Sequence, residues 1–191
     1  YGIVAARGPA GVRAVLASVR AREDELPEAA IAALQSVAHQ LAGLDDEIAE
    51  LERRILAWHR ASETSRRLAT IPGIGPITAT AIAATVPDPG QFRSGRQFAA
   101  WLGLTPRANS SGGKERLGGI SRAGDGYIRR LMVVGATAVL RFARQRGGGQ
   151  WITSLIARKK PKAAAVAVAN KSARIAWALM ARGEVYTPRA A

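Results

Sequence analysis

A stripe of apolar residues along one predicted helix restricts the fold of this chain more than any other feature. Its members alternate spacings of three and four residues without a break: Leu34, Val37, Leu41, Leu44, Ile48, Leu51, Ile55 and Trp58. A mean repeat of 3.5 residues is the a/d pattern of a coiled coil. Pro27 and Glu28 suit a helix start, so the pattern predicts one long coiled-coil helix over residues 27–60.

The stripe needs a partner, because a continuous line of apolar side chains is unfavourable in water. A second copy of the chain would give a homodimer or a higher homo-oligomer, whereas packing within one copy would leave a monomer. The sequence favours the homo-oligomer, since little else in it can cover so long a stripe.

The residues on either side of this helix are punctuated by glycine and proline. Residues 1–26 are expected to form a partly helical junction that is interrupted at Gly8, Pro9 and Gly11. The chain begins with Tyr1 rather than Met, which favours a fragment whose N-terminal domain is missing.

The remainder is expected to form a compact helical domain over residues 61–146, which includes a long loop rich in Gly and Ser at 104–124. Asp125 is placed to cap a helix that runs to Arg146. Residues 147–191 are expected to be a basic linker followed by a last helix at about 162–182. No strand pattern is strong enough to predict, so the expected fold class is all-α.

The net charge of +14 is unevenly distributed. Up to Arg60 there are seven basic and nine acidic residues, whereas from Ala61 there are twenty-one basic and five acidic ones. Neutralising phosphates is the commonest use of such an excess, so it predicts a nucleic acid as partner. A basic ribosome-associated protein is the alternative.

Other compartments and chemistries are disfavoured by composition. No apolar run has the length of a membrane span, and no export signal opens the chain, so we expect no membrane partner and a cytoplasmic location. The chain has no cysteine, which excludes disulfides and thiolate metal sites. The five acids after residue 60 are too scattered to build a two-metal site.

The segment IPGIGP at residues 71–76 predicts a tight turn between two helices, as in a helix-hairpin-helix. Gly73 and Gly75 permit unusual backbone angles and close approach, with Ile74 between them. Their N–H groups, with those of the next helical turn, would face outward at the positive end of a helix dipole and bind a DNA phosphate. A plain turn between helices is the alternative.

A second candidate site lies in the loop, where Ser110 and Ser111 precede two glycines. The side chains of Arg107, Lys114, Arg116 and Arg122 could surround a phosphoryl group there. A serine that attacks a phosphodiester would store the bond as a phosphoserine ester for later rejoining. Loops of Ser and Gly are also ordinary linkers, and the residues alone leave both interpretations open.

Three long stretches carry a family resemblance: LATIPGIGPITATAIAA, FRSGRQFAAWLGLTPRANSSGGKERLGGISRAGDGYIRRLMVVGA and ARIAWALMARG. From Tyr1 to about Tyr186 the chain resembles transposases of the insertion-sequence one-ten family, the bridge-RNA-guided recombinases. The resemblance implies a RuvC-like N-terminal domain with four metal-binding acids, then a coiled coil, then a transposase domain with a nucleophilic serine. In this chain the nucleophile would be Ser111 or Ser110, with Ser111 slightly favoured.

The resemblance also implies the partners and the reaction. The DNA contacts would come from Gly73, Ile74, Gly75, Arg107, Lys114, Arg116, Arg122, Arg129 and Arg130. The partners would be DNA and a guide RNA, and Mg²⁺ would be held by the missing domain, with no cofactor in this chain. We therefore expect a serine nucleophile that cuts and rejoins strands during transposition.

Because the family joins both domains in one active site, the chain alone is expected to bind DNA without cutting it. A non-catalytic DNA-binding module and a site-specific DNA invertase of the same broad family are the alternatives.

Overall fold

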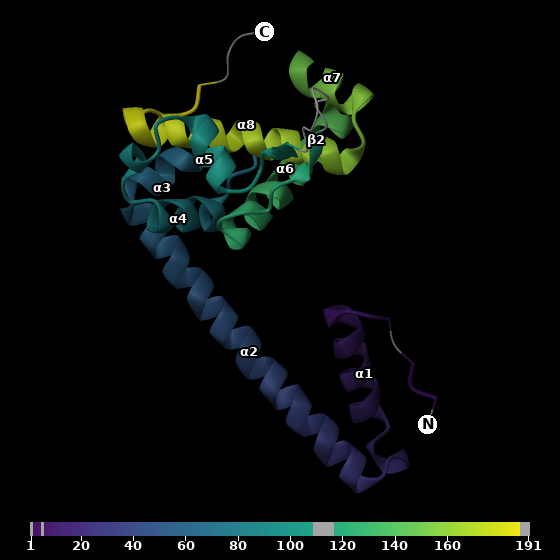
Figure 1. Cartoon of the computed structure of the whole chain (residues 1–191). Coiled ribbons are helices and arrows are strands. Elements are labelled where there is room, and N and C mark those ends of the chain that lie inside the picture. Colours follow the sequence, from purple (N-terminus) through teal and green to yellow (C-terminus); the bar gives the residue numbers. More distant parts are fainter. Residues whose placement is uncertain (1, 5, 109–116, 188–191) are drawn as a thin grey trace. The chain divides into compact units, whose positions relative to one another are not determined.

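The computed structural model describes residues 2–4, 6–108 and 117–187. Nearly all the regular structure in them is helical, which confirms the all-α fold class. The chain divides into two compact units, Tyr1–Arg54 and Ile55–Ala191, and each is described by itself (Figure 1).

The first unit begins with α1, Pro9–Ala21, followed by the short 3-10 helix η1, Glu23–Glu25. Pro9 stands in the first turn of α1, and Gly11 lies inside the helix. The expected interruption at these residues is therefore wrong. The physical reason is that proline at a helix start has a suitable φ and lacks only an N–H that would have no partner there.

Helix α2, Glu28–Ala61, is one uninterrupted helix of 34 residues and begins and ends one residue later than predicted. None of its residues is buried. Val37, Leu44 and Leu51 are 53, 54 and 56% exposed. The central part of the apolar stripe therefore lies on the surface of the single chain.

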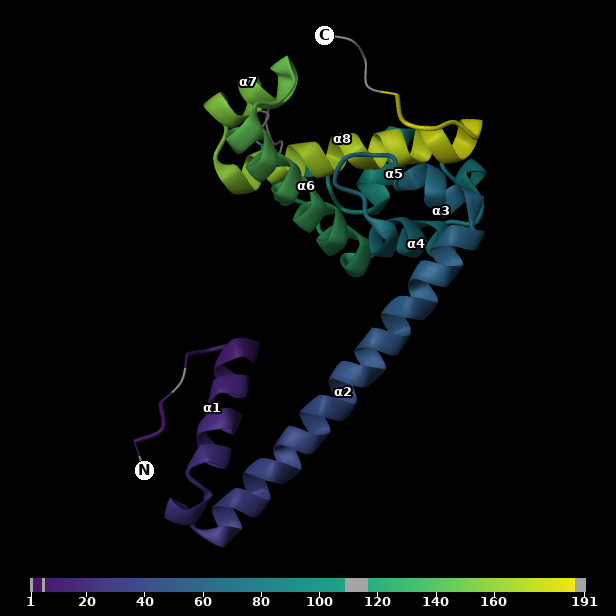
Figure 2. The same ribbon diagram turned by 180° about the vertical axis from the view of Figure 1, so that it is seen from behind.

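The second unit contains two long helices, α6 and α8, and several shorter ones, and Figures 1 and 2 show the last helix, α8, alongside α3, α5 and α6. Its elements after α2 are α3 (Glu63–Leu68), α4 (Pro76–Thr85), the 3-10 helix η2 (Pro89–Gln91), α5 (Gly95–Trp101), β1 (Pro106–Ala108), β2 (Leu117–Ile120), α6 (Gly126–Arg146), α7 (Gln150–Arg158) and α8 (Pro161–Arg182).

Helix α8 forms the centre of this unit through a face of small residues. Ala169, Ala173 and Ala176 are completely buried, and their spacing of three and four places them on one side of the helix. Neighbouring helices can approach α8 closely there. At the first residue of α5, a Cβ on Gly95 would lie 2.8 Å from the Arg174 carbonyl oxygen of α8.

The prediction that Asp125 caps the start of α6 is confirmed. The Asp125 carboxylate accepts hydrogen bonds from the N–H groups of Tyr127 and Ile128, at 2.8 and 2.9 Å. These are two of the donors that a helix leaves unpaired at its N-terminus. The helix then runs to Arg146, as expected.

Two segments expected to be irregular contain regular structure. Within the predicted loop 104–124, β1 and β2 pair antiparallel, with Pro106 opposite Ile120. Strands of three and four residues are too short to show an alternating pattern. The expected linker after residue 147 contains α7, which is held by the buried Leu155 and its half-buried neighbours Ile152 and Ile156.

In the described part of the chain, no helix combines the length and the apolar character that a bilayer crossing requires.

The loop between α3 and α4 is packed directly against the backbone of α6. Gly73 has a φ of +84°, and a Cβ on Gly135 would lie only 1.8 Å from the Gly73 carbonyl oxygen. Neither position has space for a side chain, so the two glycines allow a backbone-to-backbone contact.

Replacing Gly135 with Ala should therefore lower the free energy of unfolding by about 1–3 kcal/mol, the usual cost of overpacking. Gly43→Ala is the matched control, because Gly43 also lies inside a helix but has nothing within 4 Å of a Cβ. This control should be neutral or stabilising by up to about 1 kcal/mol, since alanine is the better helix former. Urea denaturation followed by circular dichroism measures both, and equal stabilisation by the two would contradict the contact.

Candidate functional site

The three residues expected to form one phosphate-binding turn occupy different environments. Gly73 is pressed against α6, and Ile74 is 4% exposed within the core. Gly75 is exposed, with an ordinary φ of −85° and nothing within 4 Å of a Cβ. Of the three, only Gly75 offers an open surface that a ligand could approach.

Gly75 is also the N-cap of α4, and it supplies no side chain to satisfy the first N–H groups of that helix. Pro76 follows and carries no N–H, so the next donor is the backbone of Ile77, whose side chain is 43% exposed. The first turn of α4 contains no acidic residue. The partial positive charge of the helix terminus is therefore left uncompensated there, as an anion site requires.

The serines follow β1 and precede β2 in the chain. Ser110, Ser111, Lys114 and Arg116 lie outside the described residues. Ala108 pairs with Leu117, so the two described residues that flank 109–116 are neighbours in space.

The predicted arginines near this segment are used in different ways. Arg107, on β1, is exposed and donates from Nη2 to the Ser121 carbonyl oxygen at 2.9 Å. Arg122, just after β2, is exposed and has a φ of +58°, which is unusual outside glycine. Arg130 is exposed on α6. These three side chains are accessible to a ligand.

Arg129 has a structural role that the sequence did not indicate. It is half-buried, and its Nη1 donates to two carbonyl oxygens, those of Leu102 at 3.1 Å and Ala123 at 2.7 Å. The guanidinium therefore fastens the segment after β2 to the end of α5. The Arg129 guanidinium, which was expected to contact DNA, thus donates to two backbone carbonyl oxygens of the protein itself.

Most acids of the second unit are engaged in local structure. Glu63 pairs with Arg67 at 2.5 Å, Asp88 accepts from the Gly90 N–H at 2.7 Å, and Asp125 caps α6. Among the residues that the structure describes, no three His, Cys, Asp or Glu side chains gather to hold a metal ion.

Sequence reasoning missed a groove along α8, lined by basic and aromatic residues from α5, α7 and α8, with a volume of about 1070 Å³. Its residues come from four separated stretches of the chain, so no local motif marks them. The only local signal was the pair Lys171 and Arg174, three apart and hence on one face of a helix.

Comparison with known proteins gives the family of the chain. Residues 65–149 match the family described as "Transposase IS116/IS110/IS902 family". A putative transposase, y4pF/y4sB, of Sinorhizobium fredii is 47% identical over 189 residues, 97% of this chain and 49% of the relative. A probable family 20 transposase of Pseudomonas aeruginosa is 45% identical over 98% of this chain and 57% of its own length.

The transposase for insertion sequence element IS1111A of Coxiella burnetii is 41% identical over 77% of this chain and 41% of the relative. The chain thus spans about half the length of the curated relatives it matches. The matches cover both the long helix and the compact unit in the first two relatives. The chain belongs to the IS116/IS110/IS902 family of transposases.

Proposed function

We propose that this chain binds DNA and supplies a serine nucleophile that cuts and rejoins strands during insertion-sequence transposition. The observation that carries the proposal is the pairing of β1 with β2, the two described strands that precede and follow residues 109–116. Arg107 on β1 and Arg122 just after β2 are exposed. In sequence the two serines lie between Arg107 and Arg122, with Lys114 and Arg116 after them, so a phosphate that reached a serine would meet cations.

The proposed reaction is a phosphoryl transfer to Ser111 or Ser110. The serine Oγ attacks the phosphorus, a P–Oγ bond forms, and the bond to a deoxyribose oxygen breaks as that oxygen leaves with a proton. The serine proton passes to solvent or to a neighbouring base. Attack by a strand hydroxyl on the phosphoserine ester reverses the step and rejoins DNA without an energy source. Arginines around the phosphate would stabilise the added charge of the transition state.

DNA contact is proposed at the start of α4. Gly75 is open, and the α4 terminus carries uncompensated N–H donors. A phosphate bound there would be recognised through backbone alone, hence without sequence preference. This contact needs no serine, so a non-catalytic DNA-binding module is the second candidate function, and the serine experiment below separates the two.

The exposed stripe of α2 is proposed to pair with the same stripe of a second copy. In a full-length relative, a guide RNA and a metal-binding acidic domain would complete the assembly that the resemblance implies. We expect this chain by itself to bind DNA without cleaving it.

Gly75→Val should weaken binding to duplex DNA about tenfold, because the side chain blocks a charge-assisted backbone contact. Gly149→Val is the matched control: Gly149 is also an open N-cap glycine with negative φ, at the start of α7. Both variants lose a comparable amount of helix capping, so a difference in affinity reports the contact. Fluorescence anisotropy with labelled duplex measures it, and equal affinities would remove α4 from the interface.

Ser111→Ala or Ser110→Ala should abolish strand exchange in a full-length protein of the family that carries this sequence, tested with guide RNA and Mg²⁺. DNA binding should persist, because neither serine is charged. End-labelled DNA on denaturing gels would show the covalent protein–DNA species, which one of the two variants must lose. Ser121→Ala is the control and should retain it. Recombination by both Ser110 and Ser111 variants would leave the DNA-binding module as the function.

Replacing Leu44 and Leu51 with Glu should convert the chain to monomers, since buried charge at a/d positions opposes pairing. Ala42→Glu with Ala49→Glu is the matched control, because it adds the same charge one residue away from the stripe and should leave the oligomer intact. Analytical ultracentrifugation distinguishes the species. A monomeric unmodified chain would refute the proposed pairing.

A further inference from the structure

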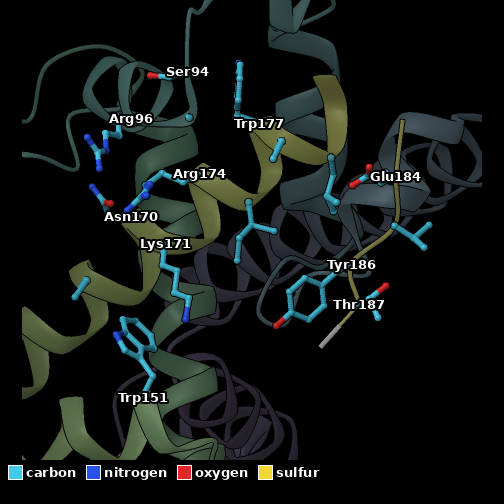
Figure 3. Close-up of a pocket in the computed structure, with 16 residues that line it drawn as sticks. Ser94, Arg96, Trp151, Asn170, Lys171, Arg174, Trp177, Glu184, Tyr186 and Thr187 are labelled. Atoms are coloured by element: carbon cyan, nitrogen blue, oxygen red, sulfur yellow. The ribbon is translucent and has the colours of Figure 1, made fainter. Parts of the chain in front are cut away.

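The groove along α8 combines features that no part of the proposed function uses. It is formed by the start of α5, by Trp151 of α7, by α8 and by the segment after α8 (Figure 3). Its volume of about 1070 Å³ is slightly above the range for small-molecule sites, about 300–1,000 Å³. It therefore has room for more than one nucleotide-sized unit.

The charge of the groove favours an anionic ligand. Arg96, Lys171 and Arg174 line it, against the single carboxylate of Glu184. Within the described residues, none of the three cations has an ion-pair partner. Lys171 and Arg174 share one face of α8, and Figure 3 shows Arg96 on the same side as Arg174. Cations spaced along a groove suit successive phosphates better than one isolated anion.

The aromatic residues of the groove favour a ligand that has a flat ring. Trp151 is 37% exposed, and the Lys171 Nζ lies 3.9 Å from its ring centroid. Trp177 is fixed by its Nε1, which donates to the Pro89 carbonyl oxygen at 3.1 Å. Tyr186 completes the lining across from Lys171 (Figure 3). Trp177 and Tyr186 are half-buried, so Trp151 is the exposed ring of the three. An exposed ring next to cations is the arrangement that binds unpaired bases along a phosphate backbone.

We propose that this groove binds a single-stranded stretch of polynucleotide, with one base stacked on Trp151 and phosphates at Lys171, Arg174 and Arg96. The Lys171 ammonium covers the Trp151 ring in the free protein. An exposed cation–π contact is weaker than base–aromatic stacking, so a base displaces the ammonium, which then pairs with a phosphate. A duplex cannot do this, because its bases are already paired and stacked.

The proposed site uses neither the serines nor Gly75 of the α4 start, so it can be tested independently of both. The probes are labelled single-stranded DNA, single-stranded RNA and duplex DNA of one sequence, titrated with the full chain at fixed salt. Trp151→Ala should lower single-strand affinity about tenfold, the size expected for one lost stacking contact. Duplex affinity should remain unchanged.

Phe142→Ala is the matched control. Phe142 is 56% exposed and also carries a cation over its ring, the Arg146 guanidinium at 5.3 Å, but it does not line the groove. This variant should bind all three probes as the unmodified chain does. Trp151→Phe, which keeps an aromatic face, should restore most of the affinity lost in Trp151→Ala.

Arg174→Gln provides a second test that does not depend on stacking. It should reduce the slope of log affinity against log salt by about 0.7 for single strands, whereas Trp151→Ala should leave that slope unchanged. If Trp151→Ala lowers the affinity for single-stranded DNA only, or for single-stranded RNA only, that result identifies which nucleic acid the groove binds. Unchanged single-strand binding in Trp151→Ala, or an equal loss of duplex binding, overturns the proposal. Polyglutamate binding with the same dependence on Trp151 would also overturn it.

Discussion

Contact between backbones without intervening side chains determines how the second unit is assembled. At Gly73 and Gly135 the α3–α4 loop meets α6, and at Gly95 the start of α5 meets α8. Each contact excludes even a methyl group, so the helices approach more closely than larger residues would permit. A close-packed interior does not accommodate added side-chain volume easily. The positions of α4, α5 and α6 therefore depend on having glycine at these contacts.

Within the turn between α3 and α4, residues that pack against the core lie next to a residue that is open to a ligand. Gly73 and Ile74 anchor the turn, and Gly75 is left open beyond them. Arg129 and Arg107 differ in exposure: Arg129 is half-buried and donates to two carbonyl oxygens, while Arg107 donates to one, that of Ser121, and is exposed. A motif that looks uniform in sequence thus consists of residues with distinct physical tasks.

The features that could be predicted from sequence are local ones. The cap by Asp125 and the stripe of α2 depend on residues within a few turns of each other, and both follow from helix geometry alone. The β1–β2 pair was missed because its strands are too short for a pattern. The structural role of Arg129 and the α8 groove were missed for another reason, since Arg129 binds Leu102 from 27 residues away and the groove residues come from separated stretches. Trp151 and Lys171 meet only because α7 folds back onto α8.

The central position of α8 has a consequence for biosynthesis. Its buried residues extend from Ala164 to Leu179, and it packs on α3, α5, α6 and α7. A ribosome makes the N-terminal elements first, so α3 to α7 leave the exit tunnel before the helix that covers them exists. Until Leu179 has emerged, the nascent chain exposes the apolar surfaces that α8 will cover. Chaperone engagement and premature termination would therefore act most strongly before α8 is complete.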